Sequence, residues 1–263
     1  MLKLIASLIA YWAIQQPALA QIPPGQIGVV VMHGKGGSPY KFVNGYAATL
    51  EQAGYKVANL EMTWSRKRQY DVSIQDSIAE VTKVFNQMRA QGVTKVFVTG
   101  QSQGAAFAAV YAGQVKVDGL VLIAPGGMVD TRSFVNKLEA DRREAQALID
   151  QGKGDEVGSF NDFEGSKGTF KRTTTARIYL DWFNPEGQLT TAAFAKVLAG
   201  TATLYVAPTR DYRGLQMGKQ RWFASLPAHP LTRLYEPDAD HLHSPDAAAP
   251  EVVTWIAQVA NQN

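Results

Sequence analysis

The sequence predicts an α/β protein: a mostly parallel central sheet covered by helices on both faces. Several short runs are apolar throughout and rich in β-branched residues, which is typical of strands buried on both faces of a sheet. Segments with the apolar spacing of a helix lie between these runs. Such alternation implies a parallel sheet that is covered by helices.

The composition is that of a globular protein. The chain has 263 residues, which suits one large α/β domain or two small ones. Its 46% hydrophobic and 19% charged residues exclude a disordered chain. The formal net charge of +3 is mild and gives no reason to expect a nucleic-acid partner. The densest basic run, residues 66–68, is interpreted as a solvated loop rather than an anion-binding patch. The absence of cysteine excludes disulfides, thiolate metal sites and a cysteine nucleophile.

The N-terminus has the features of a secretory signal peptide. Lys3 supplies one positive charge, residues 4–14 form an uncharged apolar core, and an Ala-x-Ala cleavage site ends at Ala20. The core is too short for a transmembrane helix, and an uncleaved membrane anchor is the alternative. We therefore expect residues 1–20 to be a signal peptide. Residues 21–263 would be an exported domain, periplasmic or secreted, with no stable membrane insertion after cleavage.

In the first half of the chain, strand and helix patterns alternate regularly. Strands are predicted at residues 27–32, 57–60, 95–99 and 119–124. Helices are predicted at residues 46–54, from Asp71 or Ser73 to about Ala90, and at 105–111. In the second of these helices one buried face is formed by Ile74, Ile78, Val81, Phe85 and Met88.

Residues 128–190 interrupt this alternation. Residues 131–152 are charged and helical, residues 154–175 are rich in Gly, Ser, Lys and Thr, and residues 177–183 are aromatic and fit a strand or a short helix. We interpret the segment as a cap or lid inserted over the carboxyl edge of the sheet. An ordinary long surface excursion is the alternative.

The alternation resumes after the insertion. Strands are predicted at residues 202–207 and 232–235, with a helix at residues 215–226 between them. Pro250 is predicted to open the final helix, because proline fits the first turn of a helix. The buried stripe of that helix would be formed by Val252, Trp255, Ile256 and Val259.

The most informative stretch is the motif Gly-x-Ser-x-Gly at residues 100–104. A β-branched run precedes it and a small-residue helical segment follows, so Ser102 lies at the apex of a strand–turn–helix unit. Such a sharp turn exposes the serine Oγ, and Gly100 and Gly104 occupy positions where a Cβ would collide with backbone. The helix that follows directs free N–H groups toward the region beside Oγ.

Three other polar groups follow predicted strands in the same way. They are the glycine-rich loop at residues 33–37, Asp211 and His241. Sites of parallel α/β sheets lie just beyond the carboxyl ends of the strands, so we expect these groups to meet Ser102 there. Their order along the chain is glycine loop, Ser, Asp, His.

With these motifs, residues 26–259 resemble the α/β-hydrolase superfamily. The resemblance implies that Ser102 is the nucleophile, that His241 takes and returns its proton, and that Asp211 orients the imidazole. The oxyanion hole would be formed by the N–H groups of Gln103 and Lys35. The implied protein is a serine hydrolase, a carboxylesterase of exported type, that acts on a small-molecule acyl substrate through an acyl-serine intermediate. It requires no metal and no organic cofactor.

Several alternatives stay open at this stage. Asp130 could replace Asp211 as the acid, and His243 could replace His241 as the base. The two histidines could instead bind a metal, although no further ligand cluster is visible. His33, just before the loop glycine, is expected to orient backbone rather than to react.

The type of reaction is also open. A non-catalytic ligand-binding protein on the same fold is the alternative to a hydrolase, and perhydrolysis or C–C cleavage would use the same residues. Lys35 and the cationic residues 167–172 would favour an anionic substrate if they face the site. Solvated lysines are the simpler interpretation.

Overall fold

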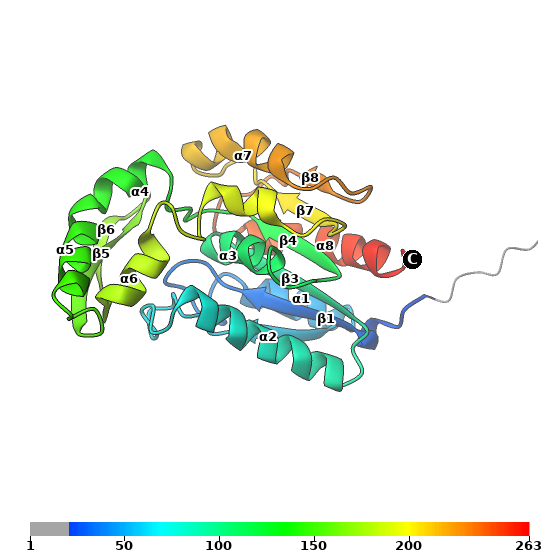
Figure 1. Cartoon of the computed structure of the whole chain (residues 1–263). Helices are drawn as coiled ribbons and strands as arrows, with labels where there is room; N and C mark the ends of the chain where they lie inside the picture. Colours follow the sequence, from blue (N-terminus) through cyan, green and yellow to red (C-terminus); the bar gives the residue numbers. More distant parts are fainter. Residues whose placement is uncertain (1–20, 263) are drawn as a thin grey trace, which may run out of the picture.

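The computed structural model describes residues 21–262 and contains the predicted parallel sheet. The predicted signal peptide, residues 1–20, lies outside the described residues. The six strands are ordered β2-β1-β3-β4-β7-β8, and every neighbouring pair is parallel (Figure 1). The strands span Ile27–Met32 (β1), Lys56–Leu60 (β2), Lys95–Gln101 (β3), Gly119–Ile123 (β4), Thr203–Val206 (β7) and Arg233–Tyr235 (β8).

Helices cover both faces of the sheet, as the apolar strand pattern predicts. Alternate side chains of each strand belong to two separate cores, because successive residues point to opposite faces. Val29 and Val31 pack with helices α1 (Asn44–Gln52) and α8 (Ser244–Ala260), whereas Val30 and Met32 pack with α2 (Ile74–Ala90) and α3 (Gln103–Ala112). Helix α7 (Arg213–Ser225) also lies on the second face.

The start of α2 is decided by a side-chain cap. Ser73 Oγ accepts a hydrogen bond from the backbone N–H of Asp76 at 3.0 Å, so Ser73 is the N-cap. Asp71 instead accepts hydrogen bonds from Thr63 and Arg68 in the preceding loop. Of the two starts that the sequence allowed, the structure selects the second.

The prediction for the final helix is wrong at its start. Helix α8 begins at Ser244, six residues before Pro250, and Pro245 occupies its first turn. Pro250 lies inside the helix on its exposed side. A proline there leaves the carbonyl of Asp246 without its helical donor. Asp246 is exposed, so water can hydrate this carbonyl and the helix continues.

Residues between β4 and β7 form an insertion, which we call the cap, and its buried aromatic side chains belong to the same apolar core as those of α2 and α3. It contains α4 (Arg132–Lys137), α5 (Glu139–Asp150), the antiparallel hairpin β5–β6 (Val157–Glu164 and Gly168–Thr175), α6 (Ala176–Phe183) and the 3₁₀ turn η2 (Thr191–Lys196). Helices α4 to α6 and the hairpin gather at one end of the sheet (Figure 1, left). The aromatic segment that fitted a strand or a helix is therefore helical.

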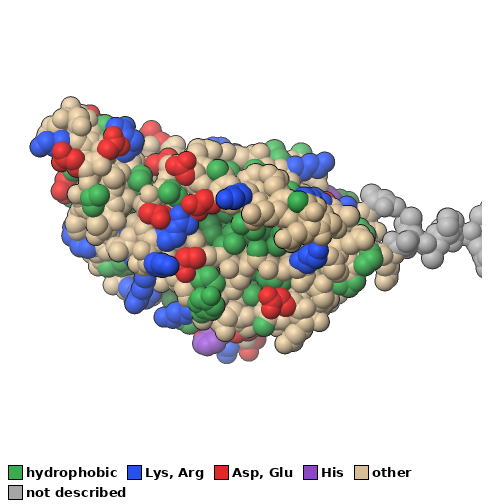
Figure 2. Space-filling model, turned by 90° about the horizontal axis from the view of Figure 1, so that it is seen from below, with side chains coloured by type: hydrophobic (Ala, Val, Ile, Leu, Met, Phe, Trp, Pro, Cys, Tyr) green, Lys and Arg blue, Asp and Glu red, His purple; other side chains and the backbone are tan. Residues whose placement is uncertain are grey.

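The surface does not concentrate one charge on the face shown in Figure 2. Basic and acidic side chains are interspersed there, and apolar side chains occur in small groups. Within residues 21–262, no helix has the length and apolar character needed to cross a bilayer.

The turn between β3 and α3 depends on two glycines at backbone contacts. A Cβ at Gly104 would lie 2.4 Å from the carbonyl oxygen of Met32 and 2.7 Å from that of His33. A Cβ at Gly100 would lie 2.2 Å from the carbonyl carbon of Gly104. Real Cβ atoms do not approach backbone this closely, so helix α3 packs directly on the end of β1 only because both side chains are absent.

We expect Gly104→Ala to destabilise the protein by about 3 kcal/mol, because overpacking against rigid backbone cannot relax by a rotamer change. Chemical denaturation monitored by circular dichroism measures the effect. Gly25→Ala is the matched control, since a Cβ at Gly25 has no atom within 4 Å. Equal stability of the two variants would contradict the proposed packing constraint.

Candidate active site

Ser102 lies at the tip of the turn between β3 and α3 in a strained backbone conformation. Its φ is +56° and its ψ is −119°, a region that non-glycine residues rarely adopt. Strand β4 supports the turn: the N–H of Ser102 donates to the carbonyl of Ile123 at 2.9 Å, and the carbonyl of Ser102 accepts from Gly126 at 3.1 Å. These two hydrogen bonds keep Ser102 in its strained conformation. Backbone strain of this kind is common at functional sites.

His241 and Asp211 meet beyond the ends of β8 and β7. Nδ1 of His241 lies 2.8 Å from Oδ1 of Asp211, and the two side chains are 9% and 3% exposed. The loop is fixed further because the carbonyl of His241 accepts from Nε2 of Gln101 at 3.1 Å. A neutral imidazole that donates from Nδ1 has Nε2 available as an acceptor. Ser102 and His241 line the same cavity, which has a volume of about 440 Å³.

The alternative residues are engaged elsewhere. Asp130 accepts hydrogen bonds from the backbone N–H and the hydroxyl of Thr191, at 2.9 Å and 2.5 Å, so it ties the two ends of the cap together. His243 pairs with Asp240 at 2.9 Å, and its side chain is 74% exposed. The geometry thus brings together Asp211 and His241 and leaves Asp130 and His243 outside the pair.

Two backbone N–H groups next to Ser102 are available for a ligand. In the glycine-rich loop, the N–H of Gly36 donates to the carbonyl of Trp64 and that of Gly37 donates to Gly34, each at 3.0 Å. Among the described residues, no acceptor is found for the N–H of Lys35. The other group is the N–H of Gln103, which is the first residue of α3 and has no intrahelical acceptor for geometric reasons.

Two hydrogen bonds of the His33 ring hold the glycine-rich loop in place. Nδ1 of His33 lies 2.7 Å from the carbonyl of Gly34, and its Nε2 accepts from the backbone N–H of Met62 at 3.1 Å. The ring is therefore a neutral imidazole with its proton on Nδ1. Burial lowers the pKa of His33, and the bond to the Gly34 carbonyl opposes that shift in part.

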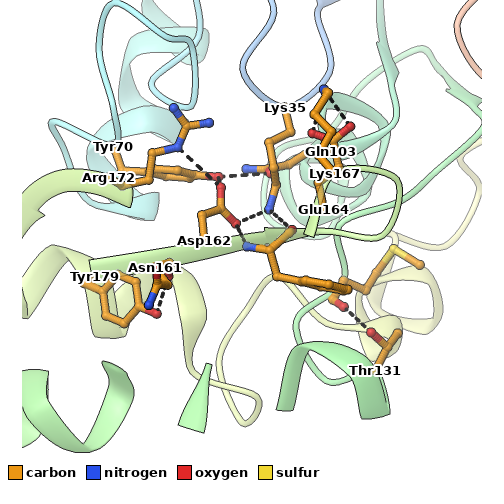
Figure 3. Close-up of polar contacts among 12 residues, drawn as sticks. Lys35, Tyr70, Gln103, Thr131, Asn161, Asp162, Glu164, Lys167, Arg172 and Tyr179 are labelled. Carbon is orange, nitrogen blue, oxygen red and sulfur yellow. Dashed lines mark hydrogen bonds and ion pairs between the residues drawn. The ribbon is translucent and has the colours of Figure 1, made fainter. Parts of the chain in front are cut away.

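A buried polar cluster joins the cap to the two residues flanking the site. Nζ of Lys35 lies 2.5 Å from Oδ1 of Asp162, and the hydroxyl of Tyr70 lies 3.2 Å from the other oxygen and 3.1 Å from Oε1 of Gln103 (Figure 3). Nε of Arg172 lies 3.5 Å from Asp162. Burial lowers the pKa of Lys35, while the Asp162 carboxylate works against that shift.

Sequence reasoning did not identify Asp162 or Tyr70 as site residues. Asp162 belongs to strand β5 of the cap, and Tyr70 belongs to a loop between β2 and α2. Asp162 follows no strand of the main sheet, and Tyr70 lies far along the loop that follows β2, so the rule that located Ser102 did not find them. Their shared signal is burial of a polar side chain, and burial is a property of the folded chain.

The main cavity is largely apolar beyond Ser102. Side chains from the cap and from α7 form its walls, among them Phe134, Phe163 and Leu215. The ring of Tyr212 lies 4.7 Å from that of His241 and shields one side of the imidazole. In residues 21–262 no group of three or more His, Cys, Asp or Glu side chains is placed to hold a metal ion.

Comparison with known families matches the N-terminal part of the chain. Residues 25–152, just under half of the chain, match the family model described as "Serine aminopeptidase, S33", which belongs to the hydrolases. This range contains the glycine-rich loop and Ser102 but ends before Asp211. No curated protein sequence matches the chain at a significant level.

Solved structures match over nearly the whole chain. A metagenome-derived lipolytic enzyme is 17% identical, over 91% of this chain and 96% of its own, with a TM-score of 0.60. A monoacylglycerol lipase from Paleococcus ferrophilus is 16% identical, over 90% and 96%, with a TM-score of 0.60. A carboxyl esterase from Bacillus coagulans is 17% identical, over 90% of each chain, with a TM-score of 0.60. At these identities the likeness shows a shared fold.

We expect the stability of the protein to fall as the pH drops from 7.5 to 5.5, in part because of His33. The unfolded chain takes up a proton near pH 6.5, whereas folded His33 cannot, since its Nε2 faces the N–H of Met62. The contribution is therefore present above pH 6.5 and is lost below it, by about 1 kcal/mol. Urea midpoints at the two pH values measure it.

His33→Asn should flatten this dependence, while His243→Gln, at an exposed position, should leave most of it in place. A wild-type slope in His33→Asn would show that His33 does not carry the effect.

Proposed function

We propose that the chain is a serine hydrolase of the α/β-hydrolase superfamily that cleaves a carboxylic ester, because its fold matches lipolytic and esterase structures and residues 25–152 match a serine aminopeptidase family. The observation that carries the proposal is the buried Asp211–His241 pair, 2.8 Å between the two atoms, at the same cavity as Ser102. A serine hydroxyl is a weak nucleophile without a neighbouring base, and a histidine oriented by a carboxylate supplies one.

In the proposed reaction, Nε2 of His241 removes the proton of Ser102 as Oγ attacks the acyl carbon. The carbonyl oxygen becomes an oxyanion that accepts hydrogen bonds from the N–H groups of Lys35 and Gln103. When the tetrahedral intermediate collapses, the alcohol leaves with the proton from His241 and an acyl-Ser102 remains. Water, deprotonated by His241, then attacks this ester and releases the acid, and the proton returns to Ser102. Asp211 stabilises the imidazolium in both halves.

The cavity supports an ester with an apolar portion. Its walls include two phenylalanines and a leucine, so an acyl chain or an apolar alcohol would be removed from water there. The structural relatives include lipolytic enzymes and a carboxyl esterase, which is the activity that we propose for this chain.

A non-catalytic protein that uses this cavity to hold a ligand is the second candidate. The same apolar walls would serve it. The buried pair of Asp211 and His241 counts against it, because a binding site has no need of an oriented base. Turnover of p-nitrophenyl acetate and butyrate separates the two functions.

We expect Ser102→Ala to abolish hydrolysis of p-nitrophenyl butyrate, by at least about 10³-fold in kcat, because the variant cannot form the acyl-enzyme. A fluorophosphonate probe should label wild-type protein at Ser102, as located by peptide mass mapping. Unlabelled Ser102 in folded protein, or turnover by the variant at the wild-type rate, would contradict the nucleophile role.

The acid and the base have matched controls within the chain. We expect Asp211→Asn and His241→Asn each to lower kcat by about 10²-fold to 10⁴-fold, because the imidazole is lost or wrongly oriented. Asp130→Asn and His243→Asn should keep kcat within about threefold, since neither residue contacts the pair. Steady-state kinetics with p-nitrophenyl butyrate decides, and a larger loss in Asp130→Asn than in Asp211→Asn would reassign the acid.

A further inference from the structure

A second cavity, which we call the cationic pocket, adjoins the site and shares Lys35 and Glu164 with the 440 Å³ cavity. Its volume is about 420 Å³, and the rest of its lining is formed by Gly36, Arg66, Gln69, Lys167, Phe170 and Arg172. Arg66 and Lys167 also line a narrow space that contains Ser102 and His241, so the pocket opens beside the reacting atoms.

The charges of the cationic pocket are unbalanced. Lys167 is paired with Glu164, at 2.8 Å. Lys35 and Arg172 share one carboxylate, that of Asp162, so two cationic side chains have a single counter-charge. Within residues 21–262 Arg66 forms no ion pair, and it is an exposed residue that lines the pocket. Together these groups form a concave site in which positive charge is in excess.

Among these side chains, Arg172 combines deep burial with a lack of hydrogen-bond partners. Only 8% of it is exposed, and its Nε has no hydrogen-bond partner within the described part of the chain. The guanidinium lies 4.6 Å from the ring centre of Phe170, and a Cβ at Gly36 would lie 3.2 Å from its Nη2. Figure 3 shows its terminal nitrogens directed away from Asp162.

Nε of Arg172 faces Asp162, and the guanidinium donates no hydrogen bond within residues 21–262, so its terminal N–H groups remain available to an acceptor in the pocket. Its planar pair of N–H groups matches the two oxygens of a carboxylate, with which it forms bidentate, charge-assisted hydrogen bonds. The guanidinium of Arg172 lies over the ring of Phe170 and beside Asp162, so it is held in place before a ligand arrives.

We propose that the cationic pocket binds a carboxylate of the substrate, so that the enzyme prefers esters that carry a negative charge a short distance from the scissile bond. This inference rests on the proposed ester hydrolysis. Arg172 and Arg66 hold the carboxylate, and the apolar remainder of the substrate occupies the 440 Å³ cavity that Ser102 lines. The sequence-based interpretation of residues 66–68 and 167–172 as solvated cations thus changes for Arg66 and Arg172.

The test compares matched esters in two arms. In the first, the charge is on the acyl side: mono-p-nitrophenyl glutarate is compared with neutral p-nitrophenyl pentanoate. In the second, the charge is on the leaving group: 4-carboxyphenyl butyrate is compared with 4-carbamoylphenyl butyrate. We expect kcat/KM of the anionic ester to exceed that of its neutral partner by about tenfold or more in one arm, which identifies the side that enters the pocket.

Arg172→Gln and Arg66→Gln should each reduce this ratio, Arg172→Gln by about tenfold, mainly through KM. A ratio is insensitive to the fraction of folded enzyme, so partial misfolding cannot imitate the effect. Arg177→Gln is the matched control, because Arg177 is an exposed arginine of the cap that pairs with Asp155 outside the pocket. Its ratio should equal that of wild type.

The inference is overturned if wild type shows no preference for the anionic ester in either arm, or if both arginine variants keep the wild-type ratio. Turnover of neutral esters that depends on Ser102 would leave the proposed function intact in that case. If no ester is hydrolysed, the proposed function fails, and the pocket is tested by thermal shift on Ser102→Ala protein. Monomethyl glutarate should then raise the Tm more than dimethyl glutarate does, and Arg172→Gln should remove the difference; equal shifts would overturn the inference.

Discussion

The site depends on a contact between two stretches of backbone. Helix α3 begins so close to the end of β1 that a Cβ at Gly104 would lie 2.4 Å from the carbonyl oxygen of Met32. This approach places the first turn of α3, with its free N–H groups, next to the glycine-rich loop that continues β1. Ser102, directly before α3, has a positive φ, and its N–H donates a hydrogen bond to Ile123. The proposed nucleophile and the proposed oxyanion donors therefore lie at one close backbone contact.

The cap is coupled to that constraint through a buried carboxylate. Asp162 comes from the cap hairpin, yet it contacts the side chain of Lys35, and through Tyr70 it is linked to Gln103. These are the two residues whose N–H groups are proposed to stabilise the oxyanion. Charges that are buried together are stable only when all partners are present, so the position of the cap and the geometry beside Ser102 depend on each other. Asp162 is also the counter-charge of Arg172, whose N–H groups form no hydrogen bond within the described residues. These groups are the basis of the proposed cationic pocket.

Much of the main sheet and several site residues could be predicted from local patterns. Strands buried on both faces are apolar throughout, so their ends are visible in the sequence, and parallel strands end at one edge. Ser102 and Asp211 follow such strands, whereas His241 follows β8, a short strand that is partly exposed. This rule could not choose between Asp211 and Asp130, because both aspartates follow a strand. It could not choose between His241 and His243 either, because both histidines lie in one loop. Only the spatial contacts separate them: Asp130 reaches Thr191, whereas Asp211 reaches His241.

The sequence by itself determined the succession of strands and helices along the chain outside the cap, the position of the Gly-x-Ser-x-Gly turn and the chain order of the polar groups. These depend on local periodicity and on glycines at positions without room for a side chain. Only the tertiary structure decided that residues 157–175 form a hairpin, that Asp162 lies between Lys35 and Arg172, and that α8 starts before Pro250. The hairpin is largely polar and half exposed, so its alternation of buried Phe160, Asp162, Arg172 and Thr174 has no apolar signature. The contact of Asp162 with Lys35 joins residues that are 127 positions apart, and a local pattern does not encode it.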